Sequence, residues 1–231
     1  MSLLERPVGQ PEFGTRMPQI FPKKIDFFTR LSGAVLILAA LSGVALAFYL
    51  MSPTVLDTGY TPVQPVPYSH KLHAGNLGMD CYYCHTTVEK AAHAAIPPTE
   101  TCMNCHTKVK EKSALLAPIR EGYETGKAVP WVNVHVLPDY VYFNHQSHVT
   151  VGVSCVSCHG RVDQMVEVKQ VQPLNMAWCL ECHRNPAPNL RPVQFVTKLD
   201  WKPEGDPAEY GRQVIAAKGI NPPTNCSGCH R

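Results

Sequence analysis

The stretch SHKLHAGNLGMDCYYCH, residues 69–85, decides how this chain folds, because it sets two histidines three residues apart and then ends in Cys-x-x-Cys-His. The stretch NHQSHVTVGVSCVSCH, residues 144–159, repeats both features. All ten cysteines of the 231-residue chain fall into such motifs. In chain order, motifs one to five are Cys81-Cys84-His85, Cys102-Cys105-His106, Cys155-Cys158-His159, Cys179-Cys182-His183 and Cys226-Cys229-His230.

Three kinds of site use paired cysteines, and the histidines separate them. A disulfide scaffold needs an even number of cysteines but gives no reason for a histidine after every second one. Zinc knuckles are paired across a longer gap, and five of them is an odd number. In a c-type haem site the two thiols bond covalently to the porphyrin, and the next histidine binds the iron. The pattern therefore predicts five covalently bound c-type haems, with the five motif histidines as proximal ligands.

Six histidines lie outside the motifs, about as many as five irons need for a second axial ligand. Positions i and i+3 share one face of a helical turn, so each His-x-x-His can serve two neighbouring haems. We expect His70 and His145 to bind the haem of their own module, and His73 and His148 to reach a haem elsewhere. The predicted distal ligands are His70, His73, His135, His145 and His148.

One distal position is open to alternatives. His93 is the sixth spare histidine, and Met176 lies three residues before Cys179. A thioether ligand would raise the haem potential, although methionine more often fills core space than binds iron. His93, His135 and Met176 are therefore the choices for completing the fifth distal set. A spare histidine can also be a surface residue or a hydrogen-bond partner of a haem propionate.

A membrane anchor is predicted near the N-terminus. The run LSGAVLILAALSGVALAFYL, residues 31–50, has no charge and is long enough to cross a hydrocarbon core. A cleaved signal peptide is the rival interpretation, because residues 45–47 read Ala-Leu-Ala. The stretch before the run is long for a signal sequence, and we expect an uncleaved anchor helix over residues 27–51.

The charges around the span predict its orientation. Lys23, Lys24 and Arg30 precede it, and Asp57 is the nearest charge after it. The positive-inside rule then places an arm of residues 1–26 in the cytoplasm of a bacterium. The remainder, residues 52–231, would lie in the periplasm or its equivalent, where haem is attached covalently.

The outer domain has the composition of a haem-filled fold. Most of the 21 prolines lie there, long amphipathic periodicity is absent, and a conventional core looks underfilled. We therefore expect mainly short α-helices and loops wrapped around five haems. The stretch YVYF, residues 140–143, is the best strand candidate, or else a linker with aromatics on a haem edge.

An internal duplication divides this domain. Tyr-Ser-His-x-x-His precedes motifs one and two, and Phe-Asn-His-x-x-His precedes motifs three and four. We predict a di-haem module over residues 65–110, a second over residues 140–190, and a fifth haem at residues 220–231.

The net charge of +3 does not predict nucleic-acid binding, because the ten propionates of five haems would reverse its sign. The arginines near the motifs are better interpreted as propionate or surface partners. They are Arg184, Arg191 and Arg231.

The motifs and the anchor together resemble the membrane-anchored pentahaem cytochrome c subunit of bacterial alternative complex III, within the wider cytochrome c3/c7-like multihaem group. The resemblance rests on the order of five motifs after one span and on the stretches YSHKLHAG, IPPTETCMNCH, YVYFNHQSH and MAWCLECHR. In the wider group, the first histidine of each pair serves the haem that follows, and the second serves a more distant one.

The resemblance implies an electron-transfer subunit with no catalysis of its own. Quinol would be oxidised in integral-membrane subunits, and electrons would pass through an iron–sulfur subunit into this chain and on to a mono-haem cytochrome or an oxidase. One alternative is a small membrane-anchored quinol dehydrogenase that feeds a periplasmic reductase. Another is a multihaem reductase with one open haem, although histidine in all five motifs disfavours the version with a proximal lysine.

Overall fold

The computed structural model describes residues 21–230, so most of the expected cytoplasmic arm lies outside the described residues. The chain divides into two compact units, with the boundary between Tyr49 and Leu50. Each unit is described by itself.

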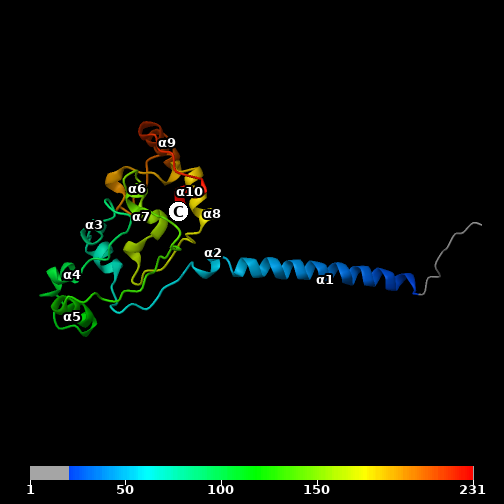
Figure 1. Ribbon diagram of the computed structural model, residues 1–231, viewed down its shortest axis with the longest axis horizontal. Coiled ribbons are helices and arrows are strands. Elements are labelled where there is room, and N and C mark those ends of the chain that lie inside the picture. The colour runs from blue at the N-terminus through cyan, green and yellow to red at the C-terminus, as the bar shows by residue number, and fades with distance from the viewer. Residues whose placement is uncertain (1–20, 231) are drawn as a thin grey trace, which may run out of the picture. The chain divides into compact units, whose positions relative to one another are not determined.

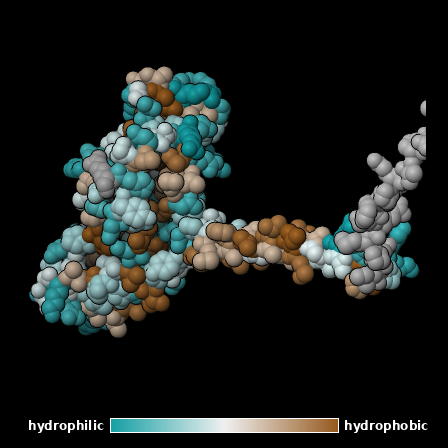
Figure 2. Space-filling model, turned by 45° about the vertical axis from the view of Figure 1, so that its right-hand side comes forward, coloured by the Kyte–Doolittle hydropathy of each residue, from teal (hydrophilic) through white to brown (hydrophobic). Residues whose placement is uncertain are grey.

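Nearly all of the described part of the first unit is helix α1 (Lys23–Leu50), which begins four residues before the predicted anchor and ends at the boundary. It has 28 residues, or about 42 Å of helix at 1.5 Å per residue. None of its residues is buried, and its length and composition suffice to cross a membrane. Figure 2 shows the apolar surface along it. The charges are confined to the start, where Arg30 and Asp26 form an exposed ion pair of 3.0 Å. The helix is consistent with the expected anchor.

The second compact unit begins at Leu50 and is called the outer unit below. It is made of short helices joined by loops (Figure 1). Its α-helices, as far as the structure describes it, are α2 (Pro53–Leu56), α3 (Cys81–Cys84), α4 (Thr99–His106), α5 (Ala117–Thr125), α6 (His145–Val149), α7 (Cys155–His159), α8 (Met176–Arg184), α9 (Pro207–Lys218) and α10 (Cys226–Cys229). A wide π-type turn, η1, spans Lys71–Asn76. Single 3₁₀ turns are η2 (Ala114–Leu116), η3 (Val162–Gln164), η4 (Ala187–Asn189) and η5 (Val193–Phe195).

Between residues 21 and 230 there is no β-strand, only two isolated bridges. One joins Val141 to His230, and the other joins Val153 to Leu190. The strand interpretation of residues 140–143 is therefore wrong, and the alternative of a linker stays a prediction. Within residues 140–143, Val141 forms a single backbone bridge with His230 of motif five. The expectation of mainly short helices and loops is confirmed.

The apolar core of the outer unit is thin. One cluster joins Val66, Met103 and Ile119, with Trp131 packed against it. The buried apolar residues that the structure describes are Val66, Val88, Met103, Ile119, Val149, Ala187, Leu190 and Val196. Side chains alone therefore give this unit little of the apolar burial that normally stabilises a domain.

The duplication seen in the sequence recurs in the packing. Tyr68 meets His70 edge-on at 4.8 Å and stacks on His73 at 4.4 Å between ring centres. Phe143 meets His145 edge-on at 4.7 Å and lies over His148 at 4.6 Å. The aromatic residue two positions before each His-x-x-His therefore contacts both imidazoles, and it restricts their rotation in both modules.

Candidate haem-binding site

Each Cys-x-x-Cys-His motif includes one helical turn, which brings its two thiols together. The turns are α3, α7 and α10, the second half of α4 and the middle of α8. Cysteines at positions i and i+3 of a helix lie on the same face. The histidine follows the second cysteine directly, at the end of the turn or just beyond it. This local arrangement is what the two thioether bonds and the proximal ligand of one haem require.

Side-chain caps fix the start of three motif helices, and the sequence reasoning missed them. The Asp80 carboxylate accepts the Tyr82 N–H at 3.0 Å at the start of α3. Ser154 Oγ accepts the Val156 N–H at the start of α7. The Asn175 amide oxygen accepts the Trp178 N–H at the start of α8, at 2.9 Å. Asp, Ser and Asn are preferred N-cap residues. A polar residue before or near each motif was the signal that could have found them.

The orientation of the histidine rings suits iron binding. In seven of them Nδ1 lies within hydrogen-bond distance of a backbone carbonyl, which can only accept. Nδ1 therefore carries the proton, and Nε2 keeps the lone pair that a metal needs. These histidines and their distances are His73 (2.9 Å), His85 (2.9 Å), His106 (2.9 Å), His145 (2.8 Å), His148 (2.8 Å), His183 (2.7 Å) and His230 (3.2 Å).

Three spare histidines face a motif histidine at one characteristic separation. The distances between ring centres are 6.2 Å for His73 and His106, 6.4 Å for His145 and His159, and 6.0 Å for His148 and His183. Two imidazoles on opposite sides of one metal, each with a metal–nitrogen bond of about 2 Å, have ring centres roughly 6 Å apart. The separations therefore fit one iron between each pair.

His70 lies near the histidine of motif one. Its imidazole is more buried than exposed, and Nδ1 is buried without a hydrogen-bond partner. Burial, followed by the nearby charges of His85 and His73, lowers the pKa of His70 to about 4. The ring is therefore neutral at physiological pH, as an iron ligand must be.

His135 has a different relation to its motif histidine. His159 Nδ1 and His135 Nε2 are 3.3 Å apart, and the two rings are perpendicular with centres 4.4 Å apart. This contact uses the Nδ1 side of His159, whereas His145 lies at the separation expected across an iron. Burial lowers the pKa of His135. Burial, followed by the nearby charge of His135, lowers the pKa of His159 to about 3.

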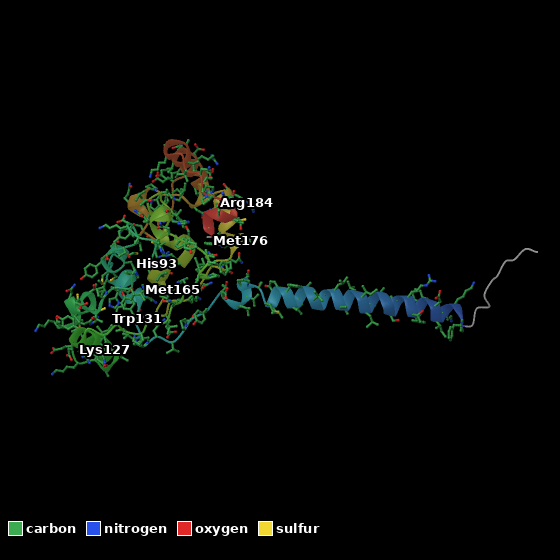
Figure 3. All side chains as sticks on the ribbon, viewed as in Figure 1. His93, Lys127, Trp131, Met165, Met176 and Arg184 are labelled. Atoms are coloured by element: carbon green, nitrogen blue, oxygen red, sulfur yellow. The ribbon has the colours of Figure 1, made fainter. Side chains whose placement is uncertain are left out.

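The structure places the remaining candidate ligands at the surface. His93 is exposed, and Met176 is exposed at the first position of α8; both are labelled in Figure 3.

The ring of His230, the histidine of motif five, contacts Tyr140, with ring centres 5.6 Å apart. Of the arginines, Arg184 is exposed, whereas Arg191 lies over the Trp201 ring and donates to the Lys198 carbonyl at 2.9 Å. Arg231 lies outside the described residues.

Six of the ten thiols, those of Cys84, Cys102, Cys155, Cys158, Cys179 and Cys182, lie in partly buried surroundings that raise their pKa and favour the uncharged form. Burial, with the nearby thiols of Cys182 and Cys179, raises the pKa of Cys158 to about 11. A hydrogen bond with Cys81, together with burial, raises the pKa of Cys155. A neutral thioether suits such an environment, so the thiols and the imidazoles both fit covalently attached haem.

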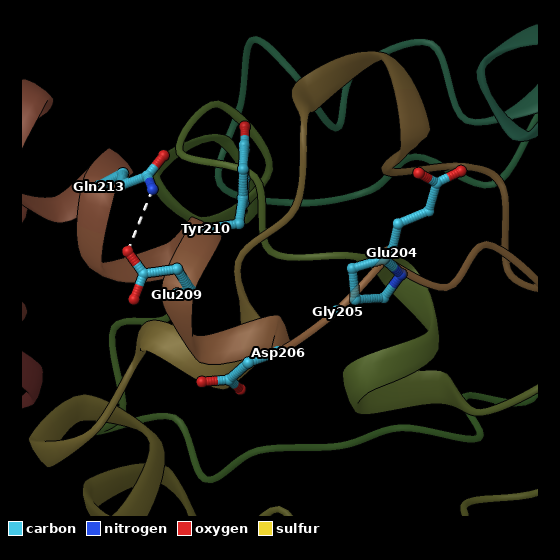
Figure 4. Close-up of a pocket in the computed structure, with 7 residues that line it drawn as sticks. Glu204, Gly205, Asp206, Glu209, Tyr210 and Gln213 are labelled. Atoms are coloured by element: carbon cyan, nitrogen blue, oxygen red, sulfur yellow. Dashed lines mark hydrogen bonds between the residues drawn. The ribbon is translucent and has the colours of Figure 1, made fainter.

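A surface hollow of about 450 Å³ lies apart from these groups, at the start of α9 (Figure 4). It is lined by Pro203, Glu204, Gly205, Asp206, Glu209, Tyr210 and Gln213. Glu209 accepts a hydrogen bond from Gln213, and Arg212 lies against Asp206 and Glu209. The lining contains no cysteine or histidine and takes no part in the haem site.

The comparison with protein families agrees with this geometry. Residues 141–231 match the family described as cytochrome c7 and related cytochrome c. The matched part contains motifs three to five and the second His-x-x-His. This part of the chain is therefore similar to proteins of that family.

One relative extends the comparison. The chain is 36% identical over 100 residues to the multihaem cytochrome c subunit of menaquinone reductase from Nitratidesulfovibrio vulgaris. The alignment includes 42% of this chain and spans 45% of the length of that relative. Both comparisons are with c-type cytochromes, and each includes less than half of this chain.

Proposed function

We propose that the chain is an electron-transfer subunit of a quinol-oxidising membrane complex and binds five c-type haems. The observation that carries the proposal is the set of imidazole pairs with centres 6.0–6.4 Å apart, each beside a Cys-x-x-Cys-His turn. When bound, a c-type haem supplies reversible one-electron transfer at its iron. Two imidazoles per iron close both axial positions, which favours electron transfer over chemistry at the metal.

The paired histidines supply four of the distal ligands in this proposal. His145 and His148 would oppose His159 and His183, and His73 would oppose His106, because their rings lie at the separation of an axial pair. His70 would oppose His85. The support for this last pair is the duplication, which makes His70 the counterpart of His145, and the proximity of the two rings.

We assign His135 to the support of a proximal ligand, in place of the distal role expected from the sequence. If His159 Nδ1–H donates to His135 Nε2, then His159 Nε2 is free for iron, whereas the acceptor nitrogen of His135 is already occupied. A partner of this kind raises the basicity of a ligating histidine and fixes its ring. His135 is therefore a positioning residue in this proposal.

The fifth haem would then take Met176 or His93 as its distal ligand, and we favour Met176. Met176 begins α8, and Cys179 follows one turn later. Burial, followed by the nearby Cys229 thiol of motif five, raises the pKa of Cys179, so this part of α8 lies close to motif five. A thioether here would give this haem a higher potential than the four with two histidines.

The proposed location is the bacterial inner membrane, with α1 as a single-pass anchor and the haem domain in the periplasm. The support is the length and composition of α1 and the lysines at its start, Lys23 and Lys24. The relative's name connects it to menaquinone, which favours a quinol-linked role here as well.

The proposed partners are those of alternative complex III: integral-membrane quinol subunits, an iron–sulfur subunit and a mono-haem cytochrome c or oxidase. A small quinol dehydrogenase that feeds a periplasmic reductase is the second candidate, because an anchor helix such as α1 and histidine-ligated haems would serve it equally. Purification from the native membrane separates the two. A stable complex of many subunits supports the first, and a free or singly partnered cytochrome supports the second.

Intact mass and haem quantification test the core of the proposal. We expect the mass of the chain plus five haems and an oxidised spectrum that is entirely low-spin. The mass of the bare chain, or of the chain plus zinc, would refute it. A haem that binds carbon monoxide or cyanide readily would instead indicate an open iron and favour a multihaem reductase.

A further inference from the structure

We propose that the five attachment motifs form one row in the order two, one, three, four, five, so that electrons cross the chain in this order or its reverse. This inference rests on the proposed function, since it orders haems that the motifs would bind. It differs from the order of the motifs in the sequence at one decisive place: motif three neighbours motif one and not motif two.

Motifs one and two are joined directly. The Asn104 amide inside motif two donates to the Tyr83 hydroxyl inside motif one, at 3.2 Å. His73, which precedes motif one in η1, faces His106 of motif two with ring centres 6.2 Å apart. The turn before motif one therefore reaches both of these motifs.

Motifs one and three are held together by one short segment. Ser154, the cap of motif three, is almost fully buried and donates to the Val196 carbonyl at 2.7 Å. The hydroxyl of the next residue, Thr197, donates at 2.9 Å to Asp80, the cap of motif one. Two consecutive residues thus contact the start of α3 and the start of α7, which lie beside one another.

Three further contacts support the neighbourhood of motifs one and three. The Lys71 N–H in η1 donates to the Met165 carbonyl just after motif three, at 2.9 Å. His145, which faces His159, has its Nδ1 2.8 Å from the Ala92 carbonyl after motif one. The thiols of Cys81 and Cys155 are also close enough to interact.

Motif three continues to motif four and then to motif five. His145 and His148, one turn apart on α6, face His159 and His183 respectively, so motifs three and four flank one short helix. His183 Nδ1 then lies 2.7 Å from the Pro223 carbonyl, three residues before Cys226. Motif four is therefore adjacent to motif five, and the row ends there.

The row has a functional consequence. Electron tunnelling falls steeply with distance, so exchange between neighbours dominates. The haems at motifs two and five are the two ends and would exchange electrons with the donor and the acceptor. The haem at motif three is the centre, and its loss would divide the row into two pairs that do not exchange directly.

The test uses the full chain in detergent micelles, fully reduced so that six-coordinate haem iron is diamagnetic. Proton nuclear Overhauser contacts between haems identify neighbours. His70→Met, His73→Met and His145→Met assign the haems of motifs one, two and three respectively, because a methionine ligand adds its own shifted methyl signal. We expect contacts between the haems of motifs one and three and none between those of motifs two and three.

A contact between motifs two and three without one between motifs one and three would overturn the order. Should any of these variants fail to fold, anomalous scattering at the iron edge from crystals of the unaltered chain decides the same point. The iron beside Cys155 should then be nearer to the iron beside Cys81 than to the iron beside Cys102. Fewer than five haems, with haem still present at motifs one, two and three, would count against the proposed function but not against the order, which the contact between motifs one and three decides.

Discussion

Replacing His145 by alanine gives the most direct reading of the ligand assignment. The His145 ring is nearly parallel to that of His159, with an angle of 6° and centres 6.4 Å apart, and its Nδ1 is held by the Ala92 carbonyl. The substitution removes this ring and leaves Cys155 and Cys158 in place. Covalent haem content should therefore stay at five per chain, while one haem loses its distal ligand.

The expected magnitude follows from the count of pairs. One of the five motifs loses its opposed imidazole, so one-fifth of the haem iron should become high-spin. Electron paramagnetic resonance of the oxidised protein measures this fraction, and pyridine haemochrome measures the haem content. Added imidazole should restore the low-spin state. The double variant with His148→Ala should bring the high-spin share to two-fifths, because His148 faces a different motif.

Ser147→Ala is the matched control, since Ser147 is exposed and lies between the two histidines on the same turn. It should leave all five haems low-spin. A His145→Ala protein with five haems and a wholly low-spin spectrum would refute the assignment of this residue.

The other predictions concern residues outside the paired histidines. His135→Ala should leave every haem low-spin but lower the basicity of His159 and shift one haem potential, as a potentiometric titration would show; a high-spin haem would make His135 a distal ligand instead. Met176→Ala should make one haem high-spin with haem content unchanged, whereas Met165→Ala should not; an all-low-spin spectrum would return the fifth position to His93. Ser154→Ala should destabilise the outer unit by about 2–4 kcal/mol in denaturant unfolding, because a cap is lost and the buried Val196 carbonyl loses its donor. A loss below about 1 kcal/mol would show that the buried hydrogen bond contributes little.

The class of fold could be predicted from the sequence because each motif is local. Cys-x-x-Cys-His fits within one turn, and the His-x-x-His pairs recur before motifs one and three. The sequence also showed that Tyr68 and Phe143 occupy corresponding positions in the two repeats. These features depend on spacing along the chain, which the sequence states directly.

Features that depend on distant contacts could not be predicted in the same way. Counting spare histidines made His135 a candidate ligand, but a count does not reveal that its Nε2 lies 3.3 Å from His159 Nδ1. The strand at residues 140–143 was predicted from β-branched and aromatic residues, but these residues found only one bridge partner, His230. The order of the motifs depends on Val196 and Thr197, ordinary residues with no motif to mark them.

The hydrogen bonds of Val196 and Thr197 have a consequence for biogenesis. They connect positions 42 and 117 residues apart in the chain. Neither can form until residue 197 has been synthesised, so the first four Cys-x-x-Cys-His motifs exist before these two hydrogen bonds can form. Under the proposed function, haem attachment at those four motifs could therefore precede the contact between α3 and α7 that these hydrogen bonds hold.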